Sequence, residues 1–164
     1  MKFHIPLFIL LLALTVSACG DASVPQNPQI EVEDPWVRAA VVMNMQMGDE
    51  MSGSSTSHMG GGTSAAYLTL RNKGKETDRL INVQSDVAEF AEIHTSQTTQ
   101  GVTSMEKVDS VEIPTQGKVV MEPGGMHIML IGLKRDLRPV DTIQLTLEFE
   151  QSSPLEVKAE VRLP

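Results

Sequence analysis

The sequence predicts an all-β domain, an antiparallel sandwich or barrel, and three observations carry this prediction. Apolar and polar residues alternate over short runs, most clearly across 142–150, as in a strand with one buried face. Turns containing glycine or proline separate these runs at short intervals. No stretch longer than about ten residues has the period of an amphipathic helix. Many short strands joined by turns are typical of sandwiches and barrels, although the order of the strands is not readable from them.

The N-terminal segment predicts export. Lys2 and His4 precede an apolar run over 5–16, which has the length of a signal-peptide core and is short for a bilayer span. The run closes on a small-residue stretch before Cys19 that resembles a bacterial lipobox, in which the cysteine is lipidated and the chain is cut before it. We therefore expect 1–18 to be a lipoprotein-type signal peptide and Cys19 to carry a lipid anchor. The alternative is an ordinary signal peptide with a nearby cut site.

The charge and the cysteine count of the remaining chain narrow its function. The net charge is −8 and becomes one unit more negative when Lys2 is removed with the signal peptide. This acidity argues against nucleic acid as a partner, because phosphates attract lysine and arginine. Cys19 is the only cysteine in the chain. With Cys19 acylated, the domain forms no disulfide and offers no thiol as a ligand or nucleophile.

Residues 19–29 are expected to form a tether, and a single β-domain follows over 30–161. The tether contains prolines and no apolar period. Turns are expected at 72–74, 100–101, 116–117 and 123–125, each of which contains glycine. The expected strands are, in chain order, 30–32, 36–40, 66–71, 79–83, 91–96, 102–108, 118–121, 127–133, 142–150 and 155–161.

A methionine-rich segment interrupts the strand pattern and predicts a loop over 43–62. It is too polar to pack as core. Thioether and imidazole groups suit copper(I), so one interpretation is an accessory copper site, and the other is a loop that merely happens to be rich in methionine. The candidate accessory ligands are Met43, Met45, Met47, Met51, His58 and Met59.

Two His–Met pairs are expected to share strand faces. His127 and Met129 lie two residues apart in a predicted strand, so both side chains point to the same face. His94 and Met105 flank residues 99–100, and a tight hairpin centred there would place them directly opposite each other. If both pairs meet at one end of the barrel, they form a site of two imidazoles and two thioethers.

The chemistry of this donor set favours copper(I). Thioethers are soft ligands that need no deprotonation, and they are not lost to disulfides outside the cytoplasm. A methionine or a histidine alone is more commonly a packing or hydrogen-bonding residue. Beyond the signal segment, however, the chain has three histidines, and two of them fall into His–Met pairs.

The spacing of these residues resembles the motif of the PCuAC family of periplasmic copper chaperones. Ten residues separate His94 from Met105, and 21 separate Met105 from His127, with Met129 two positions further. The surroundings of the motif are similar too, and the resemblance covers about 30–161. It implies a cupredoxin-like, antiparallel Greek-key β-barrel that binds copper(I) through these four residues.

The resemblance also implies a role in the cell envelope. The family supplies copper to the CuA centre of cytochrome c oxidase or serves extracytoplasmic copper homeostasis. The expected partners are therefore a copper acceptor, such as cytochrome c oxidase subunit II or another copper carrier, and a membrane reached through the lipid anchor. The expected location is the periplasm or the outer face of the plasma membrane. Met126 stands where the family commonly has an aromatic residue, and its strand position points it away from the face of His127, so we expect it to pack.

Other classes of function have less support in the sequence. An electron-transfer cupredoxin needs a cysteine ligand, which the domain lacks. A structural or adhesive β-sandwich lipoprotein without stoichiometric metal is the main alternative. We expect no catalysed reaction, because the chain has no Ser–His–Asp cue, no nucleotide-binding glycine motif and no three-histidine zinc pattern.

Overall fold

The computed structural model of the chain describes residues 24–42, 62–99 and 101–163. These residues form ten strands and no helix, which confirms the prediction of an all-β domain. In the described part of the chain, no helix is long and apolar enough to cross a membrane. The strands are β1 (Ile30–Arg38), β2 (Thr63–Asn72), β3 (Asp78–Ser85), β4 (Ala88–Thr99), β5 (Val102–Lys107), β6 (Val111–Ile113), β7 (Lys118–Met121), β8 (Met126–Leu133), β9 (Thr142–Phe149) and β10 (Leu155–Arg162).

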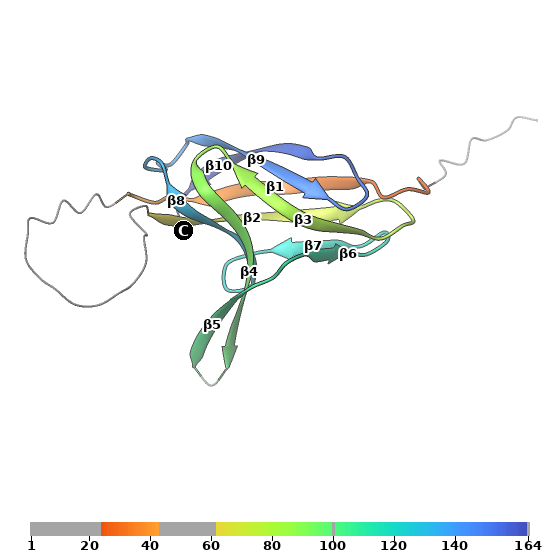
Figure 1. Cartoon of the computed structure of the whole chain (residues 1–164), viewed down its shortest axis with the longest axis horizontal. Helices are drawn as coiled ribbons and strands as arrows, with labels where there is room; N and C mark the ends of the chain where they lie inside the picture. The colour runs from red at the N-terminus through yellow and green to blue at the C-terminus, as the bar shows by residue number, and fades with distance from the viewer. Residues whose placement is uncertain (1–23, 43–61, 100, 164) are drawn as a thin grey trace, which may run out of the picture.

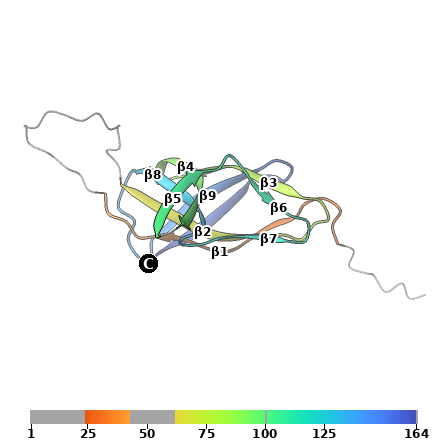
Figure 2. The same cartoon turned by 90° about the horizontal axis from the view of Figure 1, so that it is seen from below.

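The strands close into a barrel in the order β4-β8-β2-β1-β10-β9-β3, and β3 returns to β4 (Figure 1). The closing contact is narrow, since Val83 and Ala91 are its one paired position. β5, β6 and β7 pair with β4, β3 and β2 and lie outside this ring. Viewed at right angles in Figure 2, the barrel is elongated along the direction of its strands.

One ladder departs from the expected antiparallel pattern. β1 and β10 run parallel, and the other ladders between the described strands are antiparallel. Alternation of apolar and polar residues reports which face of a strand is buried, but it carries no information on the direction of the neighbouring strand. Parallel pairing requires a long connection, and here nearly the whole domain connects the two strands.

The core is built from the alternation that the sequence predicts. In β9, Ile143, Leu145, Leu147 and Phe149 are buried, whereas Gln144 between them is exposed. Each such side chain contributes about 1.5–3 kcal/mol to the free energy of folding by leaving water. Buried residues of β2, β4 and β8 join the same cluster. One face of these three strands is therefore committed to the core, and the other is left for further contacts.

Two of the predicted strands are one strand with a bulge. The sequence predicts separate strands at 30–32 and 36–40, but β1 is continuous and shifts its register against β2 between Glu33 and Trp36. Asp34 has a φ of 44°, and Pro35 follows it. Proline lacks the N–H that a regular ladder needs, so it is accommodated at such a bulge. The short strand β6 was not predicted, because three residues are too few to show a period.

The β4–β5 hairpin has a different register from the predicted one. His94 lies opposite Lys107, and Met105 lies opposite Ser96. The prediction that His94 and Met105 face each other directly is therefore wrong. Gly101 has a φ of 81°, a conformation that glycine adopts at little cost. Thr99 pairs with Val102, so the centre of the hairpin lies one residue later than predicted. Glycine next to the assumed centre thus shifts the pairing by two positions.

The β4–β5 hairpin extends out of the barrel past Met126, the first residue of β8. The last paired position of β4 with β8 is Thr95 with Met126, so residues 96–99 of β4 pair only with β5. Figure 1 shows residues 96–99 and 102–105 as a two-stranded projection, here called the arm. All residues of β5 are exposed.

Candidate metal site

The structure brings the four predicted ligands to three adjacent strands. His94 lies on β4, Met105 on β5, and His127 and Met129 lie on β8. β5, β4 and β8 are consecutive neighbours in the sheet. The residues that alternate with the ligands, Ile93, Ile128 and Leu130, are in the core cluster. The candidate site therefore occupies the face of the sheet opposite the core.

The two histidines form the centre of the site. His94 and His127 are directly opposite each other in the β4–β8 ladder, and their ring centres are 6.0 Å apart. The whole of His127 is only 6% exposed, and the side chain of His94 is 14% exposed. This cross-strand pair was not predicted, because β4 and β8 are distant in sequence and alternation does not identify a strand's neighbour.

The two methionines flank this pair. Met129 is half-buried and lies opposite Glu92, one same-face position along from the histidines. Met105 is a diagonal neighbour of His94, at a spacing of about 7–8 Å that a long side chain can span. Met105 is 54% exposed. The site therefore grades from a buried imidazole on β8 to an exposed thioether at the edge of the sheet.

Hydrogen bonds assign different tautomers to the two rings. The Nε2 of His94 lies 3.0 Å from a carboxylate oxygen of Glu92, which can only accept, so this nitrogen carries the proton. The Nδ1 of His127 lies 3.1 Å from the carbonyl oxygen of Gly125 and donates to it. Each neutral ring therefore keeps one nitrogen with a free lone pair, Nδ1 in His94 and Nε2 in His127.

Glu92 and Lys107 support His94 from the side. Lys107 Nζ lies 2.6 Å from the second carboxylate oxygen of Glu92. The Lys107 ammonium, and then the His94 ring, hold the pKa of Glu92 below its usual range, against the opposing effect of burial. Neither residue was predicted from the sequence. Glu92 precedes His94 by two positions, so strand alternation alone would have placed it on the same face.

An aromatic row continues the site across the sheet. The ring of Tyr67 on β2 lies with its centre 6.4 Å from that of His127, and the ring of Trp36 on β1 lies 4.5 Å from Tyr67. Tyr67 is buried. These rings wall the site on the side away from the arm. Their contribution was not predicted, because it depends on the neighbour order β1-β2-β8.

A soft metal ion fits this arrangement. Metal–imidazole bonds are about 2 Å long and the nitrogen lies about 1 Å from the ring centre, so rings that share an ion between them have centres at most about 6 Å apart. The 6.0 Å separation lies at this limit. His94 Nδ1 is buried and has no hydrogen-bond partner among the described residues. Met105 and Met129 place two thioethers on the same face as the histidines. The described residues contain no group of three or more His, Cys, Asp or Glu placed to hold a metal.

The other sequence predictions have mixed outcomes. Met126 packs against the core cluster, as its strand position predicts. Cys19 and the accessory candidates lie outside the described residues, namely Met43, Met45, Met47, Met51, His58 and Met59. Their proposed roles remain predictions.

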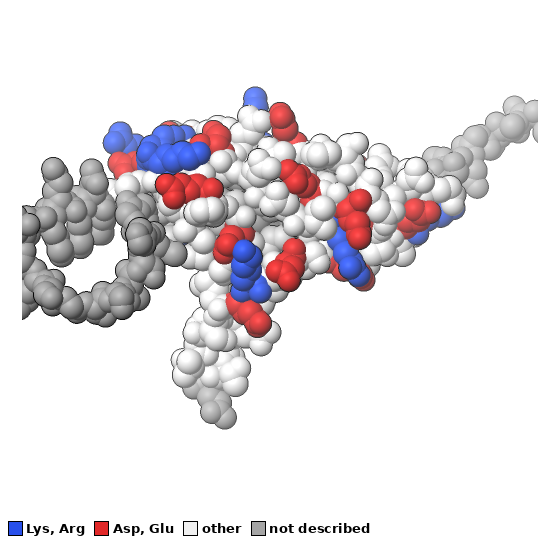
Figure 3. All heavy atoms as spheres, in the orientation of Figure 1, with Lys and Arg blue, Asp and Glu red and all other residues white. Residues whose placement is uncertain are grey.

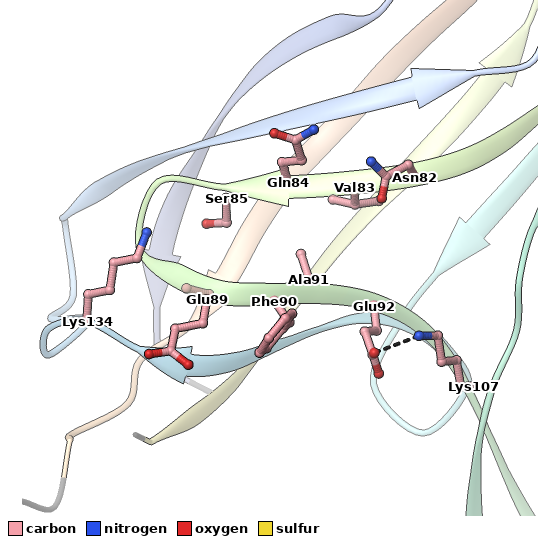
Figure 4. Close-up of a pocket in the computed structure, with 11 residues that line it drawn as sticks. Asn82, Val83, Gln84, Ser85, Glu89, Phe90, Ala91, Glu92, Lys107 and Lys134 are labelled. Atoms are coloured by element: carbon pink, nitrogen blue, oxygen red, sulfur yellow. Dashed lines mark hydrogen bonds and ion pairs between the residues drawn. The ribbon is translucent and has the colours of Figure 1, made fainter. Parts of the chain in front are cut away.

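The surface near the site is divided between a charged body and an uncharged arm. Figure 3 shows lysine, arginine and acidic side chains over the barrel and at the base of the arm, but none along the rest of the arm. Residues 95–105 indeed contain no charged side chain. An open groove of about 470 Å³ lies where β3 and β4 separate, with Phe90, Lys134 and the Glu92–Lys107 pair along it (Figure 4). None of the four candidate ligands lines this groove.

Known proteins similar to this chain in sequence include a lipoprotein and an uncharacterised protein. A relative from Leifsonia xyli subsp. xyli, named as a lipoprotein, is 29% identical over 93% of this chain and 84% of its own. An uncharacterised protein of Rickettsia prowazekii is 30% identical over 87% of this chain and 71% of its own.

Solved structures similar to this one are PCuAC domains and a protein of Deinococcus radiodurans. The copper-bound PCuAC domain from PmoF2 has a TM-score of 0.58 and 24% identity, over 85% of this chain and all of that domain. The copper(I) form of the D. radiodurans protein DR1885 has a TM-score of 0.54 and 25% identity, over 80% of this chain and 78% of its own. The cupredoxin-like fold implied by the sequence motif is thereby confirmed.

The family assignment rests on nearly the whole described domain. The model of the LpqE-like lipoprotein family matches residues 30–161, which include all ten strands except the last residue of β10. The resemblance to PCuAC proteins stated from the motif agrees with this match and with the similar structures. The chain belongs to the LpqE-like lipoprotein family, and its β-barrel has the fold of PCuAC copper chaperone domains.

Proposed function

We propose that this protein is an extracytoplasmic copper chaperone that binds one copper(I) ion as cargo through His94, Met105, His127 and Met129. The observation that carries the proposal is the pair of imidazoles 6.0 Å apart beside two thioethers. One imidazole has a buried Nδ1 without a hydrogen-bond partner in the described part of the chain. Borderline nitrogen and soft sulfur ligands without a thiolate suit copper(I). The copper-bound relatives support the same assignment.

The proposed role is transport, without a reaction of its own. Copper enters and leaves more readily where a ligand is accessible, and Met105 is the exposed ligand, at the edge of the sheet. The acceptor in this proposal is the CuA centre of cytochrome c oxidase, on subunit II, or another copper carrier of the cell envelope. The lipoprotein relatives support an anchor at Cys19 that holds the protein in the periplasm or at the outer face of the plasma membrane.

Substitution of one thioether by an alkyl group tests the proposal. Met129→Leu conserves volume and removes the sulfur, so the free energy of unfolding should change by less than about 1.5 kcal/mol. Copper(I) affinity should fall at least tenfold, equivalent to about 1.4 kcal/mol of binding free energy. The measurement is an anaerobic titration against a coloured copper(I) chelator, with X-ray absorption to count the nitrogen and sulfur ligands.

Met126→Leu is the matched control. It is the same chemical change three residues earlier on β8, but Met126 packs against the core, so affinity should stay at the wild-type value. Wild-type affinity in Met129→Leu would remove Met129 from the site. A wild-type protein that binds no stoichiometric copper(I) would instead support the structural or adhesive alternative.

A further inference from the structure

We propose that Glu92 is a positioning residue that fixes the tautomer of His94, so that His94 binds the metal through Nδ1 and His127 through Nε2. This inference rests on the proposed function, because it concerns the same site. It assigns a role to a residue outside the four-ligand motif, and it assigns the binding atom of each histidine.

Glu92 contacts the Nε2 side of the His94 ring. The two residues are separated by one position on β4 and therefore share a face. The carboxylate oxygen lies 3.0 Å from Nε2, and both side chains are largely buried, with 27% and 14% exposed. An ionised carboxylate only accepts hydrogen bonds, so Nε2 must donate. Metal-binding histidines commonly donate their second ring N–H to a carboxylate in this way.

The contact at Nε2 determines the protonation of the other ring nitrogen of His94, Nδ1. A neutral imidazole has one N–H, so a proton on Nε2 leaves a lone pair on Nδ1. His94 Nδ1 is buried without a hydrogen-bond partner among the described residues. Buried polar atoms in native proteins are nearly always satisfied, and an exception requires an explanation such as an absent ion. A metal at Nδ1 would satisfy this atom.

In His127 the opposite nitrogen carries the proton. Its Nδ1 donates to the Gly125 carbonyl oxygen, so Nε2 holds the lone pair. The loop that supplies this carbonyl is held against β4, because Ser96 N donates to the same Gly125 oxygen at 3.1 Å. Two different supports, a carboxylate for one ring and a backbone carbonyl for the other, thus set two different binding nitrogens.

Lys107 completes the support. It lies directly opposite His94 in the β4–β5 ladder and contacts the Glu92 oxygen that His94 does not use. Figure 4 shows this ion pair at the end of the groove. With one oxygen on each neighbour, the carboxylate is held in place and is occupied, so it acts as an orienting group rather than as a metal ligand.

The test begins with the copper-free protein. Long-range proton–nitrogen NMR correlations of the imidazoles should show His94 as the Nε2–H form and His127 as the Nδ1–H form. Glu92→Leu removes the acceptor at similar volume. It should leave His94 a mixture of both tautomers and lower copper(I) affinity by about tenfold or more. Glu92→Gln keeps an acceptor oxygen, so it should retain the Nε2–H form and most of the affinity.

Glu89→Leu is the control, because Glu89 lies on the same strand, is exposed and is distant in register from both histidines. It should change neither tautomer nor affinity. Wild-type tautomers and affinity in Glu92→Leu would overturn the inference while leaving the copper site intact. Loss of one nitrogen-or-oxygen ligand from the X-ray absorption count in Glu92→Leu, with both imidazoles still bound, would identify Glu92 as a ligand and overturn it as well. Absence of copper binding by the wild type would refute the proposed function, and the tautomer measurement would still report separately on Glu92.

Discussion

At the scale of single residues, the site depends on side chains whose roles differ between adjacent positions. Met126 and His127 are consecutive, yet the first packs against the core and the second faces the proposed ion. His127 and Met129 share a face because they are two apart. The role of each side chain therefore depends both on its residue type and on the face of the strand from which it projects.

A charged residue in the turn before β9 gives a prediction on pH. The backbone N–H of Arg138, and then the Arg135 guanidinium, hold the pKa of Asp141 below its usual range. The distances to its Oδ2 are 3.0 and 2.9 Å. A carboxyl that is more acidic in the folded state stabilises the protein above its unfolded pKa of about 4, and the contribution is lost as the pH falls through the folded value.

Asp141→Asn should therefore lower the thermal unfolding midpoint at about pH 7, and the difference from wild type should shrink steadily below about pH 4. Asp109→Asn is the control, because Asp109 is exposed and makes no ion pair or side-chain hydrogen bond among the described residues. Thermal unfolding followed by circular dichroism at several pH values is the measurement. A deficit in Asp141→Asn that is equally large at acid pH would contradict the assigned cause.

At the scale of elements, the β4–β5 hairpin determines which side of the sheet Met105 reaches. Neighbouring positions of a strand point to opposite faces, so a shift of one residue moves a side chain to the other side. Exchange of Ser104 and Met105 keeps the composition and moves the thioether away from His94. Copper(I) affinity should fall to the value of Met105→Ser, with little change in unfolding. Exchange of Val102 and Thr103 on the same strand is the control and should leave affinity unchanged.

The methionine-rich segment can be tested by removal. Its described flanks lie close together, since a Cβ on Gly62 would be 3.2 Å from the Val41 carbonyl oxygen. A short Gly-Ser turn in place of 43–62 should therefore preserve the barrel. If the segment binds copper, the shortened protein should bind fewer ions and transfer them more slowly to an acceptor, because a tethered ligand raises the local ligand concentration. Equal stoichiometry and equal transfer rate would show that the segment is not a copper ligand.

At the scale of the whole molecule, the tether and the site lie toward different ends of the barrel. Residues 25–29 bond to the end of β2 near Asn72 and Lys75, whereas Met129 pairs with Ala65 near the beginning of β2. Figure 1 shows the first described residues at one end of the long axis and β8 toward the other. A protein anchored through Cys19 would thus hold the site away from the membrane, where an acceptor can reach it.

Substitution of the proposed anchor tests this organisation. Cys19→Ala should abolish incorporation of labelled palmitate and release the protein from the membrane fraction. Copper(I) affinity should not change, because the tether leaves the barrel far from the ligands. Membrane association that persists in Cys19→Ala would contradict lipidation at this position.

The sequence by itself determined the strand content and which residues are the candidate ligands. Alternation predicted the buried side chains of β9, namely Ile143, Leu145, Leu147 and Phe149. The spacing among His94, Met105, His127 and Met129 carried the family resemblance. These features are local or are periodic along one strand, so a single sequence is enough to read them.

Only the tertiary structure decided which strands are neighbours. The pairing of His94 with His127 and the Trp36–Tyr67 row depend on contacts between strands distant in the chain. The contact of Lys107 with Glu92 depends on the register of the β4–β5 hairpin. The hairpin register was wrong by two positions because the turn conformation, with Gly101 at positive φ, sets the pairing. The parallel direction of the β1–β10 ladder could not be predicted either, because alternation reports the buried face of a strand and not the direction of its neighbour. Pairing between strands is a property of the closed barrel, in which each strand's backbone hydrogen bonds must be satisfied by whichever strand lies beside it.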